Sequence, residues 1–192
     1  MPKLYSNPWK SRIGVKSKIS YFIRNEFYKW LLRKYCKGCK TVLDVACGPG
    51  QFMKVANRIG FKAYGMDADE RYRAKNVIIG DLWNVKGKYD VVFNSMIIEH
   101  MKDQEKFIKK MASLSNNIVI TISTYLSKSF YNVPDHQKPV TKVSVRWLFR
   151  RYGFRNLLSM HIPFYKAVVV VSKKVTKKDK DLESKRIREG FW

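Results

Sequence analysis

The stretch Thr41-Val-Leu-Asp-Val-Ala-Cys-Gly-Pro-Gly50 decides the fold, because it joins a strand-like run to a glycine-rich turn. Val42–Val45 is short and mostly apolar, which is typical of a strand buried in a parallel sheet. Gly48 and Gly50 follow, where the backbone can turn tightly and approach a ligand closely. Gln51–Ile59 then has helical periodicity. A strand, a glycine loop and a helix in this order predict a ligand-binding loop at the carboxyl end of the strand.

The rest of the chain continues the alternation of strands and helices. The pattern predicts strands at Lys62–Met66, Val77–Ile79, Tyr89–Asn94 and Asn117–Ser123, and helices at Asp103–Ser115 and Thr141–Tyr152. Leu157–Ile162 and Lys166–Ser172 are expected to close the sheet as an antiparallel pair around Pro163. Alternating elements of this kind predict an α/β protein of three layers, with a mostly parallel sheet and a closing antiparallel strand.

Before this alternation, residues Ser17–Tyr35 have the spacing of an amphipathic helix. Its apolar positions are Ile19, Phe22, Ile23, Phe27, Trp30, Leu31 and Tyr35. We expect this helix to pack on the edge of the sheet or to lie as a lid over the site. A helix bound at a membrane surface is the alternative.

The net charge of +24 is unevenly distributed. Residues 1–40 hold eleven Lys/Arg against Glu26 alone, and residues 173–188 hold eight Lys/Arg. The sequence therefore divides into a basic arm with an amphipathic helix (1–40), a central domain (41–172) and a basic tail (173–192). Such an excess attracts RNA, DNA or an anionic membrane surface. A purely solubilising charge is an equal alternative.

Composition excludes several classes of protein. The three cysteines are too few for a disulfide framework, and Cys36 and Cys39 form a lone CxxC that we interpret as a turn. A second ligand pair for zinc is not found, so no metal is expected. The start of the chain has no apolar leader, and no run approaches the ~20 apolar residues of a membrane span. We expect a cytoplasmic protein.

An acidic residue follows the glycine loop at an informative distance. Asp67 follows the second predicted strand about 20 residues later, where a carboxylate can accept hydrogen bonds from the two hydroxyl groups of a ribose. The loop by itself is compatible with a tight turn or with a NAD or phosphate site. A P-loop is excluded, because no GxxxxGK[ST] is present.

Four motifs in order carry a family resemblance. They are Leu43-Asp44-Val-Ala-Cys-Gly-Pro-Gly50, Tyr64-Gly-Met-Asp67-Ala-Asp, Ile79-Gly-Asp81-Leu, and Tyr89-Asp-Val-Val-Phe-Asn94-Ser with Glu99-His100. From Thr41 to Ser172 the chain resembles class I, Rossmann-like S-adenosylmethionine-dependent methyltransferases. It is most similar to the small-domain group that includes quinone-biosynthesis enzymes.

The resemblance implies S-adenosylmethionine as cofactor, S-adenosylhomocysteine as product, and a set of binding residues. For the methionine half these are Asp44, Ala46, Gly48, Gly50, Asn94 and Ser95; for the nucleoside half they are Asp67, Ala68, Asp81 and Leu82. Asp44 would orient the loop and, through water, the ammonium group. Asp67 would accept from the ribose hydroxyls and Asp81 from the adenine amino group. Either of these two alone could instead cap a loop. Ala46 departs from the family's first glycine.

The acceptor side is less specific. His100 is a candidate general base, with Glu99 beside it, and a structural role is equally compatible. The long segment from Tyr125 to Val140 is expected to form one wall of the acceptor site through Tyr125, Tyr131 and His136. We predict methyl transfer to a small or lipid-like acceptor. The alternatives are an enzyme acting on RNA or another polyanion, and a non-catalytic binding module that retains the fold.

Overall fold

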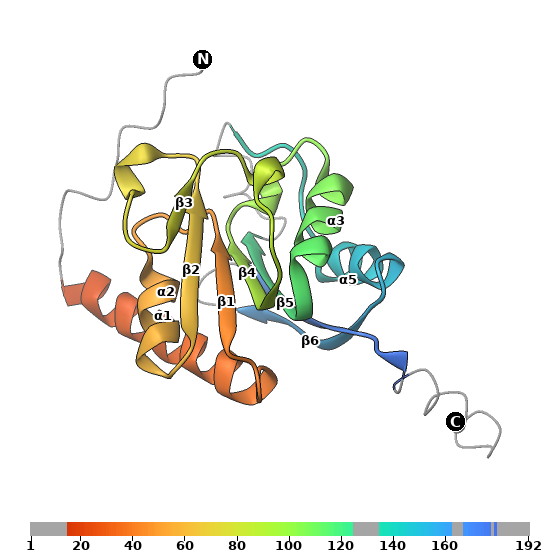
Figure 1. Ribbon diagram of the computed structural model, residues 1–192, viewed down its shortest axis with the longest axis horizontal. Coiled ribbons are helices and arrows are strands. Elements are labelled where there is room, and N and C mark those ends of the chain that lie inside the picture. Colours follow the sequence, from red (N-terminus) through yellow and green to blue (C-terminus); the bar gives the residue numbers. More distant parts are fainter. Residues whose placement is uncertain (1–14, 125–134, 163–166, 178, 180–192) are drawn as a thin grey trace.

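The structure is a computed structural model that describes residues 15–124, 135–162, 167–177 and 179 (Figure 1). Its helices are α1 (Val15–Tyr35), α2 (Gln51–Arg58), α3 (Gln104–Leu114) and α5 (Lys142–Arg151). Its strands are β1 (Thr41–Val45), β2 (Lys62–Asp67), β3 (Val77–Ile79), β4 (Tyr89–Ser95), β5 (Ser115–Thr124), β6 (Phe154–Ile162) and β7 (Ala167–Lys174). Short 3-10 helices are η2 (Glu70–Tyr72), η3 (Leu82–Asn84) and η4 (Ile98–His100).

The strands form one sheet in the order β3-β2-β1-β4-β5-β7-β6. Each neighbouring pair from β3 to β5 is parallel, whereas β7 runs antiparallel to both β5 and β6. The predicted α/β fold, with a mostly parallel sheet and a closing antiparallel strand, is confirmed. The sequence pattern did not reveal that β7, the last strand, inserts between β5 and β6.

Alternate residues of the central strands face two separate cores, which makes three layers. On one face Val42 of β1 and Phe93 of β4 pack with Phe52 of α2 and with α1. On the other face Leu43 of β1 packs with residues of α3 and α5, such as Phe107. Buried strands of this kind are apolar on both sides, which is why they read as continuous apolar runs.

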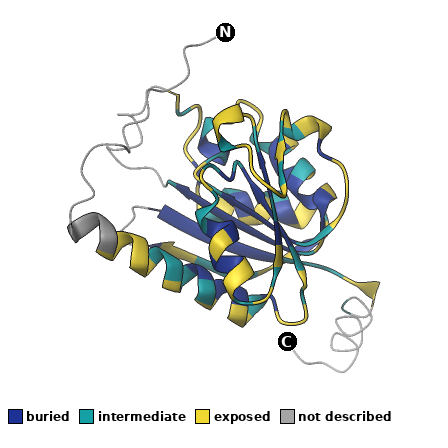
Figure 2. Cartoon of the chain, turned by 60° about the vertical axis from the view of Figure 1, so that its left-hand side comes forward, coloured by how far each residue is buried: buried dark blue, intermediate teal, exposed yellow. Residues whose placement is uncertain are grey.

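Helix α1 packs on the sheet, as one of the alternatives predicted, but only some of its predicted apolar positions are buried there. Tyr28, Leu31 and Leu32 lie in the core, whereas Ile19 and Phe22 are 54% and 64% exposed. The helix is apolar on two sides, so apolar spacing alone could not select the inner one. Of the predicted apolar positions Leu31 is buried, whereas Ile19, Phe22 and Ile23 are exposed. Figure 2 shows exposed residues along this helix, which continues from the grey amino terminus.

The amino ends of β1 and β4 are joined by one aspartate. Asp90 Oδ2 accepts hydrogen bonds from Lys40 N (2.8 Å), Thr41 N (2.9 Å) and Thr41 Oγ1 (3.0 Å). Partial burial favours a raised pKa for Asp90, but these hydrogen bonds outweigh it and lower the pKa below its usual value. Asp90 thus fixes where the two strands begin.

The cysteine pair lies before β1 and has no reactive character. Cys36 is buried, and burial raises its pKa far above the ordinary value. Burial also raises the pKa of Cys39, whose sulfur accepts a hydrogen bond from Asn117 Nδ2 at 3.4 Å. Within the described part of the chain, no three His, Cys, Asp or Glu side chains are grouped to hold a metal ion. No helix of the described residues is long and apolar enough to span a bilayer.

Candidate functional site

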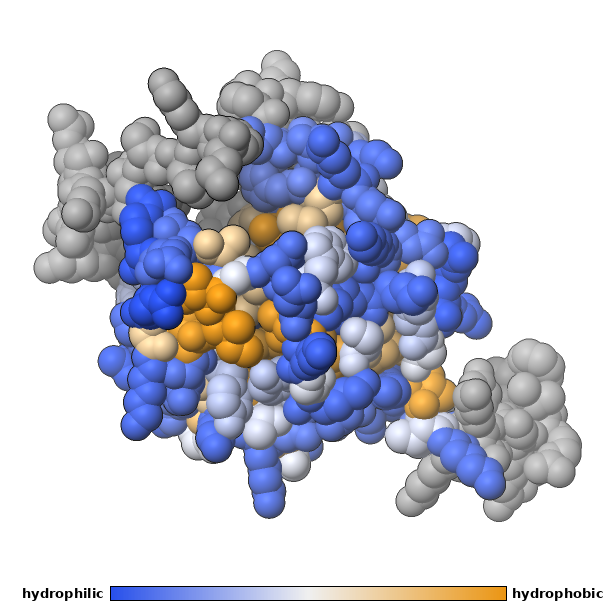
Figure 3. All heavy atoms as spheres, turned by 45° about the horizontal axis from the view of Figure 1, so that its top comes forward, coloured by the Kyte–Doolittle hydropathy of each residue, from blue (hydrophilic) through white to orange (hydrophobic). Residues whose placement is uncertain are grey.

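The predicted site residues meet where β1, β2 and β4 end. These strands are neighbours in the sheet, with Val45 paired with Met66 on one side and with Asn94 on the other. Their carboxyl ends lie at the top of Figure 1, and this edge comes forward in Figure 3, where hydrophobic side chains are exposed among hydrophilic ones. The edge has the position at which open α/β sheets bind ligands.

The loop after β1 has an unusual backbone. Gly48 and Gly50 have φ values of 51° and 72°, and Ala46 also adopts a left-handed φ of 57°. Met96, just beyond β4, has the same φ of 57°. A left-handed conformation costs a non-glycine residue about 1–2 kcal/mol and tends to occur at functional sites. Of the three non-glycine residues with a left-handed φ in the described part of the chain, Ala46 and Met96 thus lie in the two loops that leave the adjacent strands β1 and β4.

Asp44 presents a buried carboxylate at this edge. The residue is 3% exposed, and none of the hydrogen bonds found among the described residues ends on its carboxylate, whose oxygens are not among the fully buried unpaired atoms. Burial raises the pKa of Asp44 well above its usual value, and the nearby charge of Asp67 adds to this effect. Burial raises the pKa of the Cys47 thiol to about 12, and the negative charges of Asp44 and Asp67 add to this effect. A raised pKa makes the Cys47 thiol a weaker nucleophile at neutral pH, and the two carboxylates favour a cationic partner.

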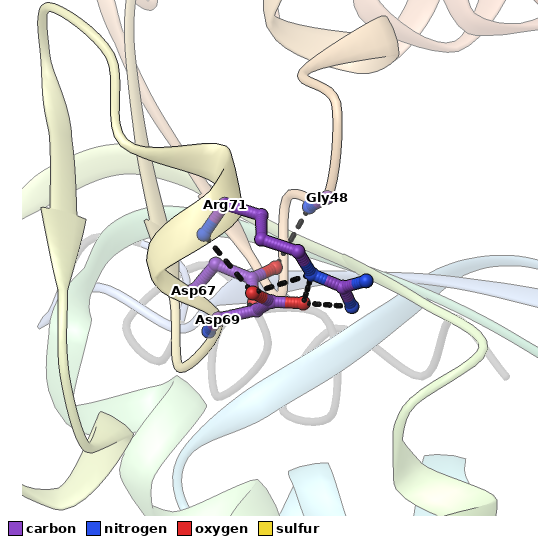
Figure 4. A network of polar contacts seen from close by, with 4 residues as sticks. All are labelled: Gly48, Asp67, Asp69 and Arg71. Carbon is purple, nitrogen blue, oxygen red and sulfur yellow. Dashed lines mark hydrogen bonds and ion pairs between the residues drawn. The ribbon is translucent and has the colours of Figure 1, made fainter. Parts of the chain in front are cut away.

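Asp67 lies at the centre of a hydrogen-bond network (Figure 4). Its Oδ2 accepts from Gly48 N at 2.8 Å, which ties the end of β2 to the glycine loop, and its Oδ1 accepts from Asp69 N at 3.0 Å. Asp69 in turn forms an ion pair with Arg71 and caps η2. Sequence reasoning did not identify Asp69 or Arg71; an Asx-type cap is their only signal.

The predicted adenine-binding residues lie on the loops after β2 and β3. Asp81 is exposed and caps η3, since its side chain accepts from Trp83 N at 3.0 Å. Leu82 is half-buried and Ala68 is exposed. The loop-capping role of Asp81 is thus observed, and its cofactor role stays a prediction.

Asn94 ends the central strand β4 inside the protein. Its Nδ2 donates to Thr121 Oγ1 at 3.1 Å and to Ile120 O at 3.4 Å, while its Oδ1 is buried with no partner among the described residues. Ser95, the next residue, is half-buried. The side chain of Asn94 fixes β4 to β5, and the predicted role of its carbonyl group is not tested by this contact.

Glu99 is a fully buried carboxylate in η4, ahead of α3 rather than at its start. Its Oε2 accepts from Ser123 Oγ at 2.9 Å, and its Oε1 accepts from Thr124 N and Oγ1, both at 3.0 Å. Gln137 N donates to the Glu99 carbonyl at 2.8 Å. Glu99 thus ties together η4, the end of β5 and the segment before α5. Sequence reasoning missed this role, because its partners are distant in the chain.

The two histidines that were expected near the acceptor do meet. The rings of His100 and His136 are in edge-to-face contact, with centroids 4.8 Å apart. Both residues are half-buried. Tyr125 and Tyr131, the other predicted wall residues, lie outside the described residues.

The comparisons with known proteins agree with this arrangement. A family model described as a methyltransferase domain matches residues 18–159. The chain belongs to this methyltransferase family. The match includes most of α1 and the strands from β1 to β5, and it ends within β6. The family resemblance thus extends further toward the amino terminus than the four sequence motifs.

The names of the curated relatives refer to methyltransferases of different substrates. The chain is 28% identical over 124 residues to a ubiquinone biosynthesis O-methyltransferase of Pelagibacter ubique, covering 56% of this chain and 52% of that protein. It is 31% identical over 123 residues to a ribosomal protein L11 methyltransferase of Thermosipho africanus, covering 55% and 47%. The chain spans about half the length of the curated relatives it matches.

Solved structures share the fold at low identity. A magnesium protoporphyrin IX methyltransferase of Synechocystis, with bound S-adenosylhomocysteine, has a TM-score of 0.67 at 18% identity and covers 85% of this chain and 89% of its own. An S-adenosylmethionine-dependent methyltransferase of Archaeoglobus fulgidus has a TM-score of 0.61 at 20% identity, with coverage of 84% and 100%. The fold of the methyltransferase family is thus present along most of the chain.

Proposed function

We propose that the chain is an S-adenosylmethionine-dependent methyltransferase, with the cofactor held at the carboxyl ends of β1, β2 and β4. Asp44 carries this proposal. A buried carboxylate without a protein donor is costly, and a ligand ammonium group would compensate it. The left-handed loop from Ala46 to Gly50 leaves room beside it: a Cβ at Gly48 would meet no atom within 4 Å. The residues present fit the methionine half of the cofactor.

The nucleoside half would lie over β2 and β3. Each Asp67 oxygen already accepts one backbone N–H, and a carboxylate offers about four acceptor positions, so both oxygens can accept a ribose hydroxyl as well. The network in Figure 4 holds this carboxylate in place before any ligand arrives. Asp81 and Leu82 would bind the adenine amino group and ring, with Ala68 beside it.

The protein's part in the reaction is positioning. When bound, S-adenosylmethionine supplies a methyl group on a sulfonium, so the chain needs only to align an acceptor in line with it and exclude water. His100 is our candidate for the base that removes an acceptor proton. Glu99, whose oxygens are taken up by Ser123 and Thr124, would act as a positioning residue for η4.

The acceptor that we propose is small or lipid-like, supported by the similarity to a ubiquinone biosynthesis O-methyltransferase. An RNA acceptor is the second candidate, supported by the net charge of +24 and by two exposed tryptophans under cations. Lys106 Nζ lies 4.6 Å from the ring centroid of Trp83, and the guanidinium of Arg151 lies 4.9 Å from that of Trp147. Aromatic rings beside cations are typical of single-strand binding surfaces.

Two further expectations stay proposals. We place the methyltransferase domain at 41–172, between a basic amino-terminal part and a basic tail, although α1 contributes Leu31 and Leu32 to the same core as β1. We also place the protein in the cytoplasm, which cell fractionation would test.

The activity is tested by incubating the full chain with donor labelled on the methyl group and with separate small-molecule, lipid, RNA and protein fractions of a cell extract. Label in the lipid or small-molecule fraction, absent with Asp44→Asn, is expected. The matched control is Asp103→Asn, because Asn caps a helix as well as Asp and Asp103 caps α3. Label in the RNA fraction would show that the acceptor is RNA and not a lipid or small molecule. Cofactor binding without transfer to any fraction would favour a binding module.

A further inference from the structure

Helix α1 carries an apolar stripe on the side that faces away from the protein. Ile19, Phe22, Ile23 and Trp30 are 54%, 64%, 49% and 38% exposed. Their spacings of three, four and seven residues place them on one side of a helix. Tyr28, Leu31 and Leu32 lie on the opposite side, in the core. We refer to Ile19, Phe22, Ile23 and Trp30 as the outer stripe.

The outer stripe is held in this orientation by the contacts of the inner side. The Tyr28 ring packs edge-to-face on Phe52 and on Phe93, each with centroids 5.3 Å apart. Gln51 Nε2, at the start of α2, donates to Asn25 Oδ1 at 3.0 Å. Because these contacts fix the rotation of α1, burying the outer stripe against the protein's own core would break them. A contiguous exposed apolar surface of this kind is typical of an interaction site.

Cations lie beside the outer stripe. Arg33 and Lys34 are exposed one turn beyond Trp30, and Lys34 Nζ lies 5.1 Å from the centroid of the Trp30 ring. Glu26 is the sole acidic residue of positions 1–40, and it is neutralised by Lys29, with 2.6 Å between Oε1 and Nζ. Glu26 lies on the same side of the helix as the outer stripe, three residues after Ile23 and four before Trp30, so the stripe includes one ion-paired carboxylate. The excess positive charge beside the stripe comes from Arg33 and Lys34.

We propose that the outer stripe binds the surface of an anionic lipid bilayer. Helices that lie in the plane of a membrane combine aromatic and aliphatic side chains with Lys and Arg, and their affinity adds apolar burial to attraction for anionic headgroups. The stripe supplies the first component, and Arg33 and Lys34 supply the second. A second copy of the chain fits less well, because pairing two such helices would bring two strongly positive segments together. RNA fits less well, because two of the four side chains are aliphatic and offer no stacking surface.

The helix that carries the outer stripe also contacts the segment that follows the glycine loop. The inner side of α1 contacts Gln51, which directly follows Gly50 of that loop. The inference itself does not rest on the proposed methyl transfer, since binding to vesicles requires no cofactor.

Flotation of the full chain with vesicles tests the proposal. Vesicles of phosphatidylcholine alone are compared with vesicles in which about one third of the lipid is phosphatidylglycerol, where anionic lipid should strengthen binding. The double variant Phe22→Ser/Ile23→Ser is expected to lose at least about tenfold in affinity for the anionic vesicles. The matched control is Val143→Ser/Met160→Ser, which removes exposed apolar side chains (65% and 36%) from α5 and β6. The control should bind as the unmodified chain does.

A second variant separates the charge from the apolar contribution. Arg33→Gln/Lys34→Gln should weaken binding to anionic vesicles and reduce its sensitivity to salt, with the outer stripe intact. Thermal unfolding of each variant establishes that it is folded. Equal vesicle binding by Phe22→Ser/Ile23→Ser and the unmodified chain would overturn the proposal. A concentration-dependent dimer, or retention of RNA, that this variant abolishes would also overturn it.

Discussion

Each end of the β1–β4 pair holds an aspartate, and the two surroundings shift the carboxyl pKa in opposite directions. At the amino end, Asp90 accepts three hydrogen bonds from Lys40 and Thr41, and its pKa is lowered. At the carboxyl end, Asp44 is more deeply buried, has no donor among the described residues, and has a raised pKa. The first aspartate stabilises the sheet, whereas the second costs stability. An unfavourable group retained beside a strained loop indicates function rather than folding.

The largest expected effect is at the amino end. Asp90→Ala removes an acceptor of three hydrogen bonds and should lower the free energy of unfolding by about 2–4 kcal/mol. Urea denaturation followed by circular dichroism measures this change. Cofactor affinity should be unaffected in the folded variant, because Asp90 lies at the far end of the strands. A loss of affinity as large as that of the carboxyl-end variants would remove the distinction between the two ends.

At the carboxyl end, Asp67→Ala should act mainly on binding. Loss of the ribose hydrogen bonds to this carboxylate should weaken S-adenosylmethionine by about 1.5–3 kcal/mol. Asp69→Ala is the comparison variant, since it disturbs the same network without removing the predicted ligand contact. Equilibrium dialysis with labelled cofactor measures both. Unchanged cofactor affinity in Asp67→Ala would refute the assignment of Asp67, at the end of β2, as the residue that binds the ribose.

The two aspartates should also give opposite dependences of stability on pH. Because the folded pKa of Asp90 is lowered, its stabilisation is present above the unfolded-state pKa of about 3.9 and is lost as the pH falls through the folded value. Because the folded pKa of Asp44 is raised, its cost appears as the pH rises from that value through the folded one. At neutral pH, Asp44→Asn should therefore raise the melting temperature and Asp90→Asn should lower it.

The differences in melting temperature between each variant and the unmodified chain should become smaller as the pH falls toward about 3, where both carboxyls approach full protonation in the unfolded chain. Thermal unfolding of the three proteins across this range is the measurement. A melting temperature of Asp44→Asn below that of the unmodified chain at neutral pH would contradict the account.

The smallest effect concerns the backbone of the glycine loop. Ala46 has a φ of 57°, so Ala46→Gly relieves strain but adds freedom to the unfolded chain, and the net gain should be about 0.5–1 kcal/mol. Chemical denaturation measures it, with Ala56→Gly in helix α2 as the control that should destabilise. A loss of stability in Ala46→Gly would mean that the left-handed loop is not strained.

Sequence patterns predicted the central sheet well, because its strands are apolar runs bounded by turns. The Asp44–Gly50 motif and the two later aspartates predicted which strand ends meet. The insertion of β7 between β5 and β6 was not predictable, since it depends on pairing between distant strands. The contacts of Glu99 with Ser123, Thr124 and Gln137 were missed for the same reason.

Helix α1 shows the other limit. Its apolar positions Ile19, Phe22 and Ile23 have helical spacing, but so do the buried Tyr28, Leu31 and Leu32. Hydrophobicity predicts that a side chain is buried against other apolar groups. It does not show whether those groups belong to the protein's own core or to a binding partner. Only the fold separates the two sides.

The central claim is that Asp44 is retained for a ligand, and calorimetric titration of S-adenosylmethionine tests it most directly. We predict saturable binding by the unmodified chain and by Asp103→Asn. Asp44→Asn should bind at least about tenfold more weakly while remaining folded, a loss of about 1.4 kcal/mol. Equal binding by Asp44→Asn, or no binding by the unmodified chain, would contradict the account.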